Sequence, residues 1–144
     1  MARHETIYGK GKLKMKYENM RFGQFIKAKR QEDPREITLK EMSTELGISL
    51  SMLSDIEQMR RRPFESDKIE AFADYLHLTD DEKALMYDLA ARESQKVPSD
   101  IEDTMMYTNV GTMARRAIRM TNAGIADEED WKSFIRKLEE KKGR

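Results

Sequence analysis

Hydrophobic residues recur every three or four positions along most of this chain, with polar residues between them. This spacing places the apolar side chains on one face of a helix, and most such segments start near a capping residue. The pattern predicts helices over residues 19–31, 38–46, 49–58, 66–77 and 79–91, and further helices that start near residues 99, 111 and 127. The sequence therefore predicts an all-α fold, in which five helices are followed by about three more.

Local signals mark the ends of these helices. Capping boxes, in which Ser or Thr is followed three residues later by Glu, occur at 38–41, 79–82 and 99–102. Gly47 is expected to end the helix before it. Other N-caps are predicted at Asn19, Ser49 and Ser66. The residues expected to face the core from the third and fourth helices are Leu50, Leu53, Ile56, Ile69, Phe72, Ala73 and Leu76.

Residues 1–18 do not follow the helical pattern. In the segment KLKMKY, residues 12–17, lysines alternate with apolar residues, which is the period of a strand. Six residues bury little surface alone, so the segment is either a basic arm or a strand that pairs with a second copy of the chain. We favour the arm. The predicted organisation is then a basic arm over 1–18, a domain over 19–91 and a helical element over 97–144.

The composition narrows the class of protein. The 144 residues include no cysteine, which excludes disulfides and thiolate metal sites and suits a reducing compartment. The sequence has no signal-peptide pattern and no apolar run of membrane-spanning length. We therefore expect a cytoplasmic protein without a membrane partner, associated with the nucleoid if it binds DNA.

The net charge of zero hides an asymmetry along the chain. Residues 1–62 hold 14 Lys and Arg against 9 Asp and Glu, whereas residues 63–144 hold 13 against 18. A basic half joined to an acidic half favours a polyanion-binding face with a separate function behind it. Chance segregation of charge is the alternative.

The segment from Thr38 to Gln58 predicts two short helices joined by a tight turn at residues 47–49. This spacing is typical of a helix-turn-helix, in which the second helix protrudes from the domain. The residues expected on the outer face of that helix are Ser51, Met52, Ser54, Asp55 and Gln58. Short polar side chains there can approach base edges in the major groove. Asp55 is either such a contact or an intramolecular partner.

Cations and helix N-termini surround the predicted reading helix. Arg60, Arg61 and Arg62 follow it directly, and Lys40 opens the helix before it. Backbone N–H groups at Thr38 and Ser49 can also reach phosphates. The arginines are predicted to bind the phosphates of a duplex; the alternative is a solvated run of charge.

Residues 20 to about 91 resemble the lambda repressor/Cro-type (XRE) family of helix-turn-helix proteins. The resemblance rests on an apolar frame, on Glu57 and on Pro63 after a basic turn; the frame is Leu39, Met42, Leu46, Gly47, Ile48, Leu53 and Ile56. It implies a five-helix DNA-binding domain that works as a homodimer on an inverted repeat. It also implies base contacts from the positions of Ser51, Met52, Ser54 and Asp55, and phosphate contacts from those of Thr38, Ser49 and Gln58.

The resemblance further implies a structural salt bridge between Arg30 and Glu57. The sequence departs from the family pattern at Met59, where a C-capping glycine is common, so the helix is expected to run on into the arginines. Ser43 replaces a usual alanine, and the longer loop at 32–37 suggests a DNA-backbone contact from Arg35.

The segment 97–144 gives fewer signals. Trp131, Phe134, Ile135 and Leu138 form an apolar stripe on its last helix, which must be buried against the preceding helices or a second copy. We expect a dimerisation element, which would place two reading helices about 34 Å apart on DNA. The methionines of this segment are either core residues or an adaptable surface.

These features favour a sequence-specific transcriptional regulator, and more specifically a repressor. An alternative is an antitoxin, whose acidic C-terminal half binds a toxin while the helix-turn-helix regulates its operon; a scaffold without a DNA role is a third possibility. The sequence shows no nucleophile pair, phosphate loop or metal-ligand cluster, since the only histidines are His4 and His77. We therefore expect no enzymatic activity, no cofactor and no metal.

Overall fold

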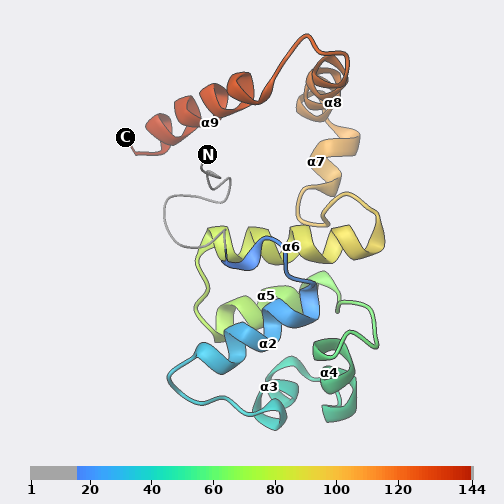
Figure 1. Cartoon of the computed structure of the whole chain (residues 1–144), viewed down its shortest axis with the longest axis vertical. Coiled ribbons are helices and arrows are strands. Elements are labelled where there is room, and N and C mark those ends of the chain that lie inside the picture. The colour runs from blue at the N-terminus through green and yellow to red at the C-terminus, as the bar shows by residue number, and fades with distance from the viewer. Residues whose placement is uncertain (1–15, 144) are drawn as a thin grey trace. The chain divides into compact units, whose positions relative to one another are not determined.

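The computed structural model describes residues 16–143 of the chain (Figure 1). These residues form the helices α2 (Phe22–Glu32), α3 (Leu39–Leu46), α4 (Leu50–Glu57), α5 (Ser66–Tyr75), α6 (Asp80–Ser94), α7 (Glu102–Tyr107), α8 (Asn109–Asn122) and α9 (Glu128–Lys142). No strand occurs among residues 16–143. The prediction of an all-α fold is thus confirmed for this part of the chain.

The chain divides after Asp100 into two compact units, Met1–Asp100 and Ile101–Arg144. We call them the N-terminal unit and the C-terminal unit. α2 to α6 belong to the first, and α7 to α9 belong to the second.

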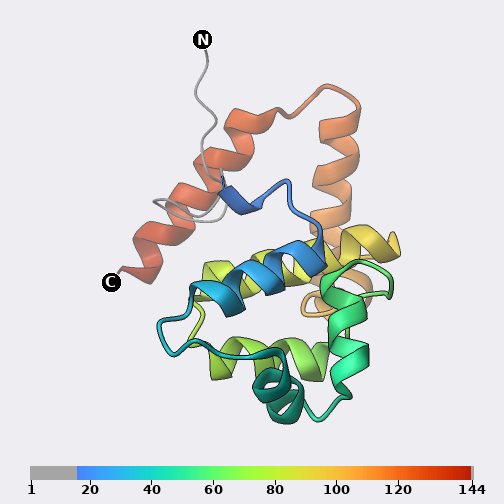
Figure 2. The same cartoon turned by 60° about the horizontal axis from the view of Figure 1, so that its bottom comes forward.

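In the N-terminal unit, α2 and α5 lie between the pair α3–α4 on one side and α6 on the other (Figures 1 and 2). α2 contacts both α4 and α6, and α5 contacts both α3 and α6. The arrangement therefore puts the short helices α3 and α4 at one side of the unit, and the acidic start of α6 at the opposite side.

The core of this unit draws on every helix from α2 to α6. Its largest fully buried side chains are Phe22, Phe25, Phe72, Ile26, Met42, Leu46, Leu53, Ile56, Ile69, Leu85 and Met86. Phe64, in the connection from α4 to α5, is also buried, and its ring meets that of Phe22 edge-on with centroids 5.0 Å apart. Sequence periodicity misses Phe64 because it stands alone after Pro63, outside any helix.

Several predicted helix ends are confirmed. Thr38 and Ser49 cap α3 and α4 through their hydroxyl oxygens, Thr79 and Glu82 form the predicted capping box, and Asp127 caps α9. Other predicted caps are wrong. The N-caps of α2, α5 and α7 are Arg21, Glu65 and Ile101 in place of Asn19, Ser66 and Ser99. A Ser or Asn near a helix start caps it only if the turn of the chain brings its side chain to a free N–H.

Tyr17 belongs to the N-terminal unit, although the sequence placed it in a free arm. It is buried and helical, and its ring meets that of Phe25 edge-on at 5.4 Å. Its hydroxyl donates a hydrogen bond to Glu32 over 2.5 Å. The strand alternative also fails at residues 16 and 17, which are helical. The rest of the predicted arm, residues 1–15, lies outside the described residues.

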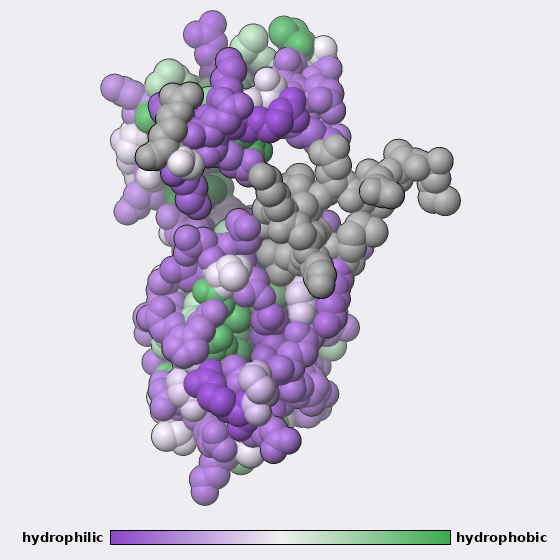
Figure 3. All heavy atoms as spheres, turned by 90° about the vertical axis from the view of Figure 1, so that its left-hand side faces the viewer, coloured by the Kyte–Doolittle hydropathy of each residue, from purple (hydrophilic) through white to green (hydrophobic). Residues whose placement is uncertain are grey.

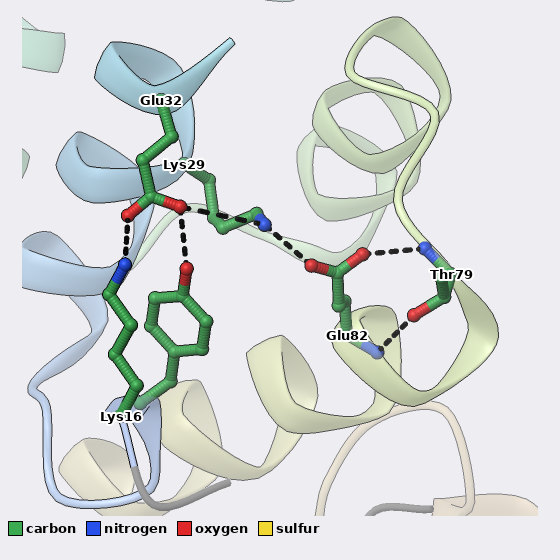
Figure 4. Close-up of polar contacts among 6 residues, drawn as sticks. Lys16, Lys29, Glu32, Thr79 and Glu82 are labelled. Carbon is green, nitrogen blue, oxygen red and sulfur yellow. Dashed lines mark hydrogen bonds and ion pairs between the residues drawn. The ribbon is translucent and has the colours of Figure 1, made fainter. Parts of the chain in front are cut away.

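A series of ion pairs and hydrogen bonds joins α2 to residues 16 and 17 and to the start of α6 (Figure 4). Lys16 Nζ lies 3.0 Å from Glu32, and Lys29 Nζ lies 4.0 Å from Glu32 and 2.5 Å from Glu82. Glu82 also accepts from the backbone N–H of Thr79 at the start of α6. Burial raises the pKa of Glu82, but hydrogen bonds from Lys29 and Thr79 outweigh it, so that its pKa lies below the usual value.

In the C-terminal unit, α7 lies directly against α8. A Cβ added to Gly111 would lie 2.1 Å from the carbonyl oxygen of Thr104, so only glycine fits there. Trp131 of α9 donates its indole N–H to the hydroxyl of Thr121 in α8 at 2.8 Å. Gly111 is nevertheless the one buried residue among residues 101–143.

Candidate nucleic-acid interface

The turn between α3 and α4 is built by local chemistry. Gly47 adopts a left-handed conformation with φ of 68°, which an L side chain resists. Its N–H donates to Thr44 and that of Ile48 donates to Ser43, which satisfies the last carbonyls of α3. Ile48 packs against the core, as predicted for a residue that plugs the turn. α4 therefore leaves the turn at a fixed angle.

The outer face of α4 carries the side chains that the sequence predicted. Ser51 is exposed, Met52, Ser54 and Asp55 are partly exposed, and Gln58 after the helix is exposed. The hydroxyl of Ser54 accepts a hydrogen bond from Gln58 at 3.3 Å. None of these side chains is sealed in the core, so their polar groups are accessible to a ligand on this face.

Leu50 is a correction to the sequence prediction. It was expected to face inward with Leu53 and Ile56, but 49% of its surface is exposed. The apolar side chains that contact the core at that end of α4 are Ile48 in the turn and the partly buried Met52. Leu50 therefore adds an apolar group next to Ser51 on the accessible surface, which the three-and-four spacing alone could not show.

Asp55 and Arg60 form an ion pair within the site. The carboxylate accepts from Arg60 Nε at 3.2 Å and from Nη2 at 3.1 Å, and Arg60 also donates to the side-chain oxygen of Gln58. The intramolecular alternative for Asp55 is thus present in the structure. The pair holds the Arg60 guanidinium beside the outer face of α4 while the arginine stays mostly exposed.

Four further groups predicted to bind phosphate lie at the surface. Arg61, Arg62, Lys40 and Thr38 are all exposed. Arg61 and Arg62 form no ion pair among residues 16–143, so both charges remain available to an external anion. Arg35, by contrast, donates to Asp33 and to the carbonyl of Tyr75, so its guanidinium is engaged within the protein.

Met59 corrects a second prediction. α4 ends at Glu57 and does not run on into the arginines, because Met59 itself adopts the left-handed conformation with φ of 63°. The N–H of Arg60 then donates to the carbonyl of Asp55 at 2.8 Å, which closes the helix end. A methionine in this conformation carries strain of about 1 kcal/mol.

Replacing Met59 with glycine should therefore stabilise the protein by about 1 kcal/mol, less whatever its side-chain contacts contribute. The Met59→Ala variant is the matched control, because it loses the same contacts but keeps a Cβ. Urea unfolding at constant slope measures both. A glycine variant no more stable than the alanine variant would show that the residue is unstrained.

Arg30 and Glu57 form the ion pair that fixes the far end of α4. Arg30 Nε and Nη2 donate to the two carboxylate oxygens of Glu57 at 2.8 and 2.9 Å, and Nη1 donates to the carbonyl of Ile37 at 3.0 Å. Both residues are buried, and hydrogen bonding to Glu57 raises the pKa of Arg30. α2, α4 and the loop before α3 are thereby joined at one point.

Gly23 is a residue of the site's framework that the sequence did not single out. A Cβ at this position would lie 2.1 Å from the carbonyl oxygen of Ile56 and 3.0 Å from that of Glu57. The backbones of α2 and α4 therefore touch here. In sequence, a glycine inside a helix indicates only weakened helix propensity, so no signal distinguished this one.

Ser43 tolerates its buried position because its hydroxyl donates to the carbonyl of Lys40 at 2.8 Å. The polar group that replaces the expected alanine is thus satisfied within α3.

The excess of acidic charge in residues 63–144 lies in the first part of that segment. Residues 63–100, which include α5 and α6, hold 10 Asp and Glu against 4 Lys and Arg, whereas residues 101–144 hold 8 against 9. The excess of acidic charge in the second half of the sequence therefore comes from the N-terminal unit, and a protein partner for the C-terminal half stays a prediction. The acidic residues belong to the N-terminal unit, and those that start α6 lie on the side away from α4 (Figures 1 and 2).

Residues 16–143 contain no cluster of His, Asp or Glu that could hold a metal ion. Within the same range, no helix is both long and apolar enough to cross a membrane.

Comparison with protein-family models, with curated proteins and with solved structures finds no match to this chain. The function must therefore be argued from the site itself.

Proposed function

We propose that the N-terminal unit is a five-helix domain of the lambda repressor/Cro type and that it binds duplex DNA with sequence specificity. The protein then acts as a transcriptional regulator, and as a repressor, because occupying an operator requires no further activating surface. The single observation that carries this proposal is the presentation of α4, a short helix fixed by a glycine turn, with an accessible face and arginines at its end.

The chemistry of the outer face fits the major groove. Ser51 and Ser54 supply short donor and acceptor groups for base edges, and Leu50 and Met52 supply apolar groups for the methyl of thymine. Asp55 either accepts from a cytosine amino group or keeps its partner Arg60 in place. Sequence readout on this face is thus mixed, with hydroxyl and apolar contacts side by side.

Groups that can bind phosphate lie around this face. Arg61, Arg62 and Lys40 supply exposed cations, while the N-termini of α3 at Thr38 and of α4 at Ser49 supply backbone N–H groups. Gln58 and Arg60 lie next to them and are already oriented by their hydrogen bonds to Ser54 and Asp55. Helix N-termini at the start of the reading helix and arginines after its end are typical of a helix-turn-helix on DNA.

The Arg61→Ala/Arg62→Ala variant tests the proposal. It should weaken binding to every duplex about equally and reduce the slope of log K against log salt by about 2, because two phosphate contacts are lost. Fluorescence anisotropy with a duplex selected from random DNA, measured between low and moderate salt, gives both quantities. The selected site also shows whether the bound sequence is an inverted repeat.

The charge-matched control is Arg116→Ala/Arg119→Ala, which removes two exposed cations from α8 in the C-terminal unit. It should leave the salt slope unchanged. The proposal would be overturned if the two variants had equal salt slopes, or if the wild-type protein did not bind duplex DNA even at low salt.

A further inference from the structure

The C-terminal unit exposes large apolar side chains on both α8 and α9. On α8, Val110 and Met113 are 61% and 62% exposed, and on α9, Phe134 and Leu138 are 54% and 45% exposed. Figure 3 shows hydrophobic residues at the surface of this unit, which forms the upper part of that view. These residues recur at the spacing of one helix face, so each helix has an uncovered apolar side.

An open apolar groove of about 600 Å³ also lies between α8 and α9. Its walls are Met113, Ala117 and Met120 from α8, with Trp131 and Phe134 from α9. A groove of this volume accommodates several large side chains from another helix.

Alone, this unit lacks a core. No apolar side chain among residues 101–143 is buried, although the unit has three helices. Helices of 14 and 15 residues are marginal in water without tertiary packing, and units of about 40 residues usually need a metal, disulfides or a partner. The absence of cysteine excludes disulfides, so the apolar faces need to be covered from outside the unit.

The charge pattern of α9 favours a second copy of the chain as this cover. α9 starts with four acidic residues, Asp127 to Asp130, and its last two turns carry Arg136, Lys137, Lys141 and Lys142 against Glu139 and Glu140. Two such helices repel when parallel, because like ends meet, and attract when antiparallel. A unit that holds 8 acidic and 9 basic residues has a net charge of only +1, too little to attract a strongly charged foreign partner.

We propose that two copies of this chain associate through the C-terminal unit, with the α9 helices antiparallel across a two-fold axis and the α9 of each copy covering the groove between α8 and α9 of the other. A two-fold axis perpendicular to a helix pair makes the two helices antiparallel, so the symmetry and the charges agree. In this arrangement Phe134 and Leu138 are buried, and the acidic start of each α9 faces the lysines of its partner.

The first test compares full-length variants by sedimentation equilibrium in the absence of DNA. Phe134→Glu/Leu138→Glu should weaken self-association about a hundredfold, because two charges enter an apolar contact. Ser133→Glu adds a charge to the exposed opposite side of α9 and should leave association unchanged. Circular dichroism and the unfolding midpoint of each variant show whether the N-terminal unit remains folded.

The second test exchanges charges. Glu128→Lys/Glu129→Lys and Lys141→Glu/Lys142→Glu should each self-associate about tenfold more weakly than the wild type, and an equimolar mixture of the two should recover wild-type association. Stronger association of the first variant alone would indicate parallel helices and overturn the proposal.

A wild-type chain that stays monomeric at every protein concentration tested would also overturn the proposal, and would leave the apolar faces to a different protein or to the N-terminal unit of the same chain. Because these measurements use no DNA, their outcome is independent of the DNA-binding proposal.

Discussion

The Glu57→Ala variant should lose about 3–5 kcal/mol of unfolding free energy, because it leaves the Arg30 guanidinium buried without its carboxylate. Only 8% of Arg30 is exposed, and the arginine would keep a single hydrogen bond, to the carbonyl of Ile37. Loss of this size is a large share of the stability of a small domain. Urea unfolding followed by circular dichroism measures it.

The matched control is Asp55→Ala. It also removes a carboxylate of α4 that binds an arginine, but the pair with Arg60 is largely exposed to solvent. Its loss should cost less than about 1 kcal/mol, since water screens exposed ion pairs. If both variants lose a similar unfolding free energy, then burial does not make the Arg30–Glu57 pair more stabilising than the exposed pair. Replacing both buried partners with methionine should recover part of the loss.

The Gly23→Ala variant should lose about 3 kcal/mol, although alanine is the better helix former by about 1 kcal/mol. The added Cβ would overlap the carbonyl oxygen of Ile56, a backbone atom that cannot move away alone. α2 and α4 must therefore separate, which displaces the helix proposed to read DNA. Thermal unfolding and duplex anisotropy should thus both change.

Lys27→Ala is the control on the same helix. Lys27 is exposed on α2, so alanine there should change stability by only a few tenths of a kcal/mol. If Gly23→Ala is as stable as Lys27→Ala, the close approach of α2 and α4 does not exist in solution.

The parts of the fold that sequence could predict are those set by near neighbours in the chain. Thr38, Ser49 and Asp127 cap helices within three residues of themselves, and Gly47 ends α3 through its own backbone conformation. Such signals need no knowledge of the tertiary structure. The partners Arg30 and Glu57, 27 residues apart, were available only through the family resemblance.

The parts that sequence missed depend on distant contacts. Gly23 is required because α4 contacts α2 at that position. Phe64 is buried against the ring of Phe22. Tyr17 is held by its hydrogen bond to Glu32 and its ring contact with Phe25. Leu50 has the spacing of a core residue but lies where the core has ended. Hydrophobic periodicity shows which face of a helix is apolar, but it does not show which turns of the helix contact the core.

The candidate site was predicted more completely than its internal contacts. The outward residues of α4 follow from counting along a helix, whereas the bond from Arg60 to Asp55 depends on the left-handed turn at Met59. The family resemblance places a C-capping glycine at this position, but methionine rarely adopts the left-handed conformation, so the sequence predicted a longer helix instead.

The separation of α6 from α4 also bears on how the molecule meets a polyanion. α6 carries five Asp and Glu against two Lys and Arg, and the three acidic residues of its first turn lie across the unit from α4. In dilute salt, the field of a duplex exerts a torque on this charge distribution and turns the arginines forward before contact. Encounters would then be productive more often than random orientation allows, and this advantage fades once the Debye length falls below the width of the unit.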